Sequence, residues 1–137
     1  MSTLHDAELE AMHIDRALER VTLGFRKPDG SYAEYRFRGV RAVRLTGLIL
    51  QNVVSRIFLS PSELLSDEEI HRIVHWIFSG DDGRSMVDHQ LVERSVADVH
   101  SGAMRLFYVD PSLGAEIGVI CKSSMQSRRK GSVRKIV

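Results

Sequence analysis

Two histidines four residues apart are the first candidates for chemistry in this chain. His71 and His75 would share one face of a helix, since side chains at positions i and i+4 lie one turn apart, and two such imidazoles could hold one metal ion. The zinc-protease form of this motif has a glutamate directly after the first histidine, where this chain has Arg72. Metal binding therefore stands as a hypothesis beside the simpler interpretation that both histidines are half-buried at the helix edge.

Trp76 is a candidate contact residue on the same segment. It lies outside the apolar stripe that runs from Ile70 to Ile77. Tryptophan is enriched among residues that dominate binding energy, so an exposed Trp76 would suit an interface. The alternative is that Trp76 packs against residues 84–99.

Basic side chains form a third candidate set. Arg36 and Arg38 alternate with Tyr35 and Phe37, so a strand would place the arginines in solvent and the aromatic rings in the core. The C-terminal segment carries no acid and adds the basic residues Arg128, Arg129 and Lys130. These cations favour nucleic-acid binding as an alternative function.

Other signs of catalysis are weak. The chain has no G-x-G-x-x-G or Walker pattern, so we expect no cofactor. Cys121 is the single cysteine, which excludes an intrachain disulfide, and we expect it to be a small buried residue of a strand. The sequence therefore favours a non-enzymatic protein.

Local patterns predict the elements that position these residues. Ser66 and Glu69 form a capping box, which predicts a helix over residues 67–78. Residues 21–26 and 33–38 alternate around a Pro-Asp-Gly turn, which predicts a β-hairpin. Residues 8–15 also fit a strand better than a helix, whereas residues 84–102 fit neither clearly.

These elements predict an α+β fold with a mostly antiparallel sheet of about six strands, covered by one main helix over residues 67–78. Residues 1–122 are predicted to form a single domain, and residues 123–137 a basic, mobile tail. The chain has 137 residues and a net charge of +1, with acidic and basic residues segregated into blocks. It contains no apolar run long enough to span a membrane, and we expect a cytoplasmic protein.

Two stretches carry a resemblance to known sequences. The opening LHDAELEAMHID with the hairpin that follows, and later VDPSLGAEIGVIC, resemble short uncharacterised bacterial domains of unknown function, some of them immunity-protein-like. The resemblance covers the first third and residues 109–121. Its motifs are structural, so it assigns a role to no residue.

Taken together, the sequence predicts a protein-interaction module. The partner would be another protein or a second copy of the chain. Nucleic-acid binding is the alternative, and a metal-dependent enzyme using His71 and His75 is the third hypothesis.

Overall fold

The computed structural model describes residues 4–61 and 65–129, and within these the chain forms one antiparallel sheet of eight strands and two helices. In chain order the elements are β1 (Glu8–Asp15), β2 (Arg20–Arg26), β3 (Tyr32–Arg38), β4 (Ala42–Thr46), β5 (Val53–Leu59), α1 (Asp67–Ile77), α2 (His89–Ser101), β6 (Arg105–Leu113), β7 (Glu116–Cys121) and β8 (Ser123–Arg129). The overall α+β class is as predicted.

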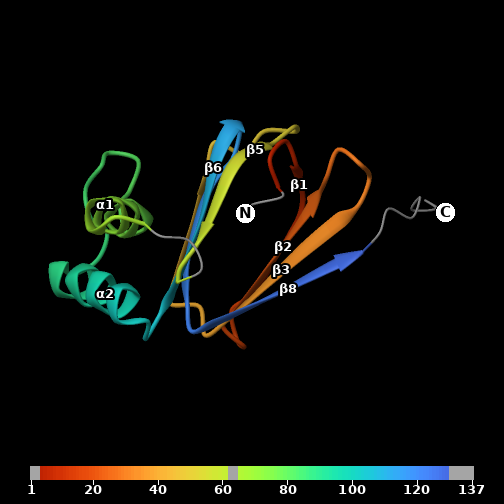
Figure 1. Ribbon diagram of the computed structural model, residues 1–137. Coiled ribbons are helices and arrows are strands. Elements are labelled where there is room, and N and C mark those ends of the chain that lie inside the picture. The colour runs from red at the N-terminus through yellow and green to blue at the C-terminus, as the bar shows by residue number, and fades with distance from the viewer. Residues whose placement is uncertain (1–3, 62–64, 130–137) are drawn as a thin grey trace.

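The sheet bends into two halves that face each other (Figure 1). Its strand order is β4-β7-β6-β5-β1-β2-β3-β8. The halves meet where Glu8 of β1 pairs with Val53 of β5, and the chain crosses between them at Lys122, between β7 and β8. The two helices cover the outer face of the β4-β7-β6-β5 half and leave the outer face of the other half open (Figure 1).

Two apolar cores follow from this arrangement. The first lies between the halves of the sheet and includes Phe25, Phe37, Phe107 and Ile117. The second lies between the helices and β6 and β7, where Ile73 and Val74 of α1 and Val92 of α2 are buried with Leu106 and Ile120. The predicted hairpin forms from β2 and β3, with Val21 opposite Phe37, and its buried face supplies much of the first core.

The prediction of about six strands and one main helix is wrong, because the described residues contain eight strands and two helices. Residues 123–129 of the predicted tail form β8, an edge strand whose described side chains are mostly exposed. Its position is set by antiparallel pairing with β3 rather than by an apolar face of its own. The second helix is α2, which buries Val92, Val96 and Val99 on one face. Residues 130–137, Lys130 included, lie outside the described part.

Helix α1 forms where the sequence predicts it. The Ser66 hydroxyl accepts a hydrogen bond from Glu69 N at 3.1 Å, and the Glu69 carboxylate accepts one from Ser66 N at 3.2 Å. These two hydrogen bonds lower the pKa of Glu69 below its usual value. Within the described residues no helix is long and apolar enough to cross a membrane.

Removing this cap should destabilise the protein modestly. Ser66→Ala is expected to lower the free energy of unfolding by about 1 kcal/mol, because the Glu69 amide loses its acceptor at the helix start. Urea denaturation followed by circular dichroism measures the change. Gln90→Ala in the exposed first turn of α2 is the control, and an equal effect of the two substitutions would contradict the assigned role of the cap.

Candidate anion-binding site

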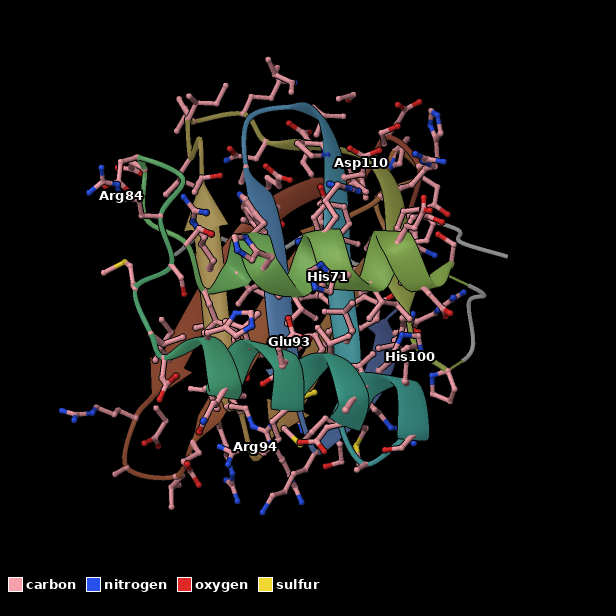
Figure 2. The ribbon with its side chains drawn as sticks, turned by 90° about the vertical axis from the view of Figure 1, so that its left-hand side faces the viewer. His71, Arg84, Glu93, Arg94, His100 and Asp110 are labelled. Carbon is pink, nitrogen blue, oxygen red and sulfur yellow. The ribbon has the colours of Figure 1, made fainter. Side chains whose placement is uncertain are left out.

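Helix α1 presents both predicted histidines on its exposed side, but they have different neighbours. His71 points toward Glu93 of α2, with Nε2 3.3 Å from Glu93 Oε1 (Figure 2). His75 lies one turn later, and its Nδ1 is 3.4 Å from the Ser79 hydroxyl. In residues 4–61 and 65–129 no group of three or more His, Cys, Asp or Glu residues is placed to hold a metal ion. In this arrangement His71 links α1 to α2, and His75 contacts the segment that follows α1.

Trp76 is partly buried and packs on the sheet, in the core that the helices share with β6 and β7. Its ring meets Tyr108 of β6 edge-on, with ring centroids 6.0 Å apart. It fits there because β7 has Gly118 beneath it, where an added Cβ would stand 3.0 Å from the Trp76 ring and 2.6 Å from Ile77. One side of the indole is left for a further contact.

Arg44 of β4 supplies that contact. Its guanidinium lies over the Trp76 ring, 4.9 Å from the centroid, and Nη1 donates a hydrogen bond to the Trp76 carbonyl oxygen at 2.7 Å. This carbonyl at the end of α1 also accepts a main-chain hydrogen bond from Ser79 N at 3.0 Å, so Arg44 adds a second donor to it. The Arg44 side chain is only 15% exposed. Arg44 is therefore held in one position before any ligand arrives.

These residues line a cavity of about 400 Å³ at the end of α1, which we call the Trp76 basin. Its polar lining comes from Arg44, Arg72, His75, Ser79 and Asp81. Asp81 is the single acid among the described residues that line it; its fully exposed carboxylate lies 3.4 Å from Arg44 Nη2. Two guanidinium groups and an imidazole around one weakly held carboxylate favour binding of an anion.

Two ionisable groups of β6 and β7 have raised pKa values. Burial and the hydrogen bond that Tyr108 donates to Glu116 raise the pKa of the Tyr108 hydroxyl far above its usual value, so it stays protonated at neutral pH. Cys121 lies on the other face of β7, in the core between the halves of the sheet, where burial raises its pKa to about 11, so this thiol is protonated as well. Neither group is therefore poised as a nucleophile at neutral pH.

The basic residues predicted to act together lie on different faces. Arg36 and Arg38 are exposed on the open face of the β1-β2-β3-β8 half, while Tyr35 and Phe37 are buried, as predicted from their alternation. Arg128 stands opposite buried Ala33, so it lies on the same side of the sheet as Ala33 and away from the face that carries Arg36 and Arg38. Arg129 is the last residue of strand β8.

Sequence reasoning singled out His75 and Trp76 but did not bring Arg44 together with them. Arg44 reaches Trp76 because β4 pairs with β7, which places Arg44 opposite Gly118. The local signal for Arg44 was its place between Val43 and Leu45, which identifies the outward position of a strand but not what lies there. A scan of the chain against protein-family models finds no match, and a search of curated proteins finds no similar sequence.

Proposed function

We propose that this protein is a non-enzymatic interaction module that binds an acidic segment of a partner protein at the Trp76 basin. The observation that carries the proposal is the Arg44 guanidinium fixed over the Trp76 ring, beside Arg72 and His75. Tryptophan and arginine are the residue types that most often dominate binding energy at protein interfaces.

The geometry keeps the cost of binding low. Arg44 already occupies one position, so a ligand does not have to immobilise a flexible side chain. The competing Asp81 carboxylate is fully exposed and lies 3.4 Å from Arg44, and an ion pair whose acid is held in solvent contributes little free energy. A carboxylate of the partner could therefore replace Asp81 at Arg44 with little loss.

The test uses a phage-displayed library of random twelve-residue peptides selected on the purified protein. We expect selected peptides to be rich in Asp and Glu, and to lose at least tenfold in affinity on Arg72→Glu and on Trp76→Ala. Arg94→Glu is the matched control, because Arg94 is exposed on the far side of α2 from α1 (Figure 2). A selection without acidic enrichment, or equal affinity for Arg72→Glu and Arg94→Glu, would overturn the proposal.

One observation favours nucleic-acid binding as a second candidate. Arg20 and Arg38 stand directly opposite each other on the open sheet face, where like charges are destabilising, and neither forms an ion pair within the described part of the chain. Glu34 on β3 and Asp15 on β1, which stands directly opposite Arg20, offset this charge. Fluorescence anisotropy with a single-stranded oligonucleotide tests this candidate. Binding that weakens steeply with salt and is lost in Arg38→Glu would support it.

A further inference from the structure

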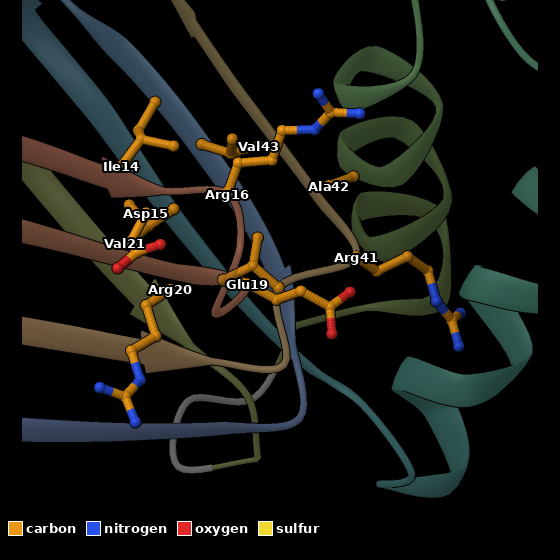
Figure 3. Close-up of a pocket in the computed structure, with 10 residues that line it drawn as sticks. Ile14, Asp15, Arg16, Glu19, Arg20, Val21, Arg41, Ala42 and Val43 are labelled. Atoms are coloured by element: carbon orange, nitrogen blue, oxygen red, sulfur yellow. The ribbon is translucent and has the colours of Figure 1, made fainter.

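Strand β4 lies at the edge of the sheet and separates the Trp76 basin from an apolar groove. Its one strand neighbour within residues 4–61 and 65–129 is β7, so the main-chain groups on its other side are not paired in the sheet. Along that open side, two cavities of about 340 and 250 Å³ lie between β4 with its following loop and strand β1. Figure 3 shows the first of these cavities, with Ile14 and Val43 among its lining residues.

The surface of the groove is mainly apolar, although the first cavity also has charged residues in its lining: Asp15, Arg16, Glu19, Arg20 and Arg41. Val43 and Leu45 of β4 and Leu9 and Met12 of β1 pack partly against the first core and leave the rest of their surface toward the groove. At one end the loop that follows β4 exposes three consecutive large apolar residues, Leu48, Ile49 and Leu50. Leu50 is 102% exposed, and contiguous exposed apolar surface of this kind marks interaction sites.

Hydrogen bonds hold this apolar loop in one conformation. Asn52 is buried, and its side-chain oxygen accepts hydrogen bonds from Ile49 N and Ala115 N, both at 3.0 Å. Its side-chain nitrogen donates to the Ile49 carbonyl oxygen at 2.5 Å. The loop is thereby fastened to the turn between β6 and β7, and the exposure of its apolar side chains is part of the fold.

The two faces of β4 differ in character. Arg44 points to the helix side and into the basin, whereas Val43 and Leu45 point to the groove. A strand added to the edge of β4 would have alternating side chains on the same two sides. Those beside Arg44 would meet a positively charged surface, and those beside Val43 and Leu45 an apolar one. Cross-strand neighbours lie about 5 Å apart, which is close enough for both kinds of pair.

Building on the proposed function, we infer that the partner segment binds as an extra β-strand along β4, with acidic and apolar residues in alternation. Its acidic side chains face Arg44 and Arg72, and its apolar side chains enter the groove beside β1. Main-chain hydrogen bonds to the free edge of β4 supply affinity, and the two unlike faces supply specificity.

The probe is an acetylated and amidated heptapeptide of alternating valine and glutamate. Trp76 is the single tryptophan of the chain, so its fluorescence reports occupation of the basin directly. We expect saturable binding by this peptide, and at least tenfold weaker binding by the valine–lysine peptide of the same pattern and by the Arg72→Glu variant. No saturation by the valine–glutamate peptide up to about 1 mM would overturn the inference.

Two N-methylated forms of the peptide test strand addition itself. Methyl groups on alternate nitrogens block one edge of the added strand in the first form and the other edge in the second. One form is expected to lose at least tenfold in affinity and the other less than threefold, because only one edge pairs with β4. Equal affinities of the two forms would overturn strand addition. The acidic-ligand function would still hold if Arg72→Glu weakened both, and it would fail separately if that variant changed neither.

Discussion

Phe107→Ala is expected to lower the free energy of unfolding by about 3–5 kcal/mol, the largest effect that we predict for a single substitution. Phe107 of β6 is completely buried between the halves of the sheet. Its ring centroid lies 4.7 Å from that of Phe37 and 5.0 Å from that of Tyr35, both on β3 in the opposite half. Truncation would leave a cavity at the point where the halves touch.

This effect should be large because few main-chain links join the two halves. In the described residues β1 and β5 are paired in register only at Glu8 and Val53, with main-chain hydrogen bonds confined to the residues next to them, so side-chain packing has to hold the rest. Urea denaturation of the purified variant measures the change. Leu113→Ala is the control, since Leu113 lies on the same strand but is 46% exposed, and we expect a change below about 1 kcal/mol. Similar values for the two substitutions would contradict a shared core.

The sequence predicts those elements in which the spacing of apolar residues within the segment matches the face that is buried in the fold. Helix α1 has its capping box and its stripe of Ile70, Ile73 and Ile77 within one short segment, and its predicted and observed bounds agree within one residue. The hairpin of β2 and β3 alternates because one of its faces is fully buried. In both cases local order and tertiary packing act on the same residues.

The elements that the sequence did not predict depend on distant partners. Strand β8 has mostly exposed side chains, so it lacks an apolar period, and it is defined by its hydrogen-bonded neighbour β3. Helix α2 buries a narrow face of Val92, Val96 and Val99 with Ser95 between them. Three valines and a serine carry a weak helical signal, because valine has low helix propensity.

The candidate site divides in the same way. His75 and Trp76 could be proposed from their positions on one predicted helix. Arg44 could not be joined to them, since the contact depends on which strand lies beside β7 and on Gly118 leaving room for the indole. A cavity between a helix end and an edge strand depends on which strands pair in the sheet. The pattern of apolar residues within one segment does not show that pairing.

Asn52→Ala is the second substitution with a large expected effect, about 3 kcal/mol, because a buried hydrogen-bonding group left without its partner costs about 1–3 kcal/mol. The variant removes the acceptor of Ile49 N and Ala115 N and the donor to the Ile49 carbonyl. Gln51→Ala next to it is the control, since Gln51 is exposed. Urea denaturation should separate the two variants clearly.

A second variant reaches Asn52 from the other side and shows whether the loss is local. Gly114 has a φ of +82°, and a Cβ at this position would stand 2.4 Å from the Asn52 side-chain oxygen, so Gly114→Ala must strain the backbone and displace that oxygen. Both variants should therefore accelerate amide hydrogen exchange at Ile49 and Ala115 in particular, and both should weaken the valine–glutamate peptide if the fixed loop shapes the groove. Unchanged exchange at these two amides in Asn52→Ala would mean that another contact fastens the loop, and the apolar surface of Leu48 to Leu50 would then not depend on Asn52.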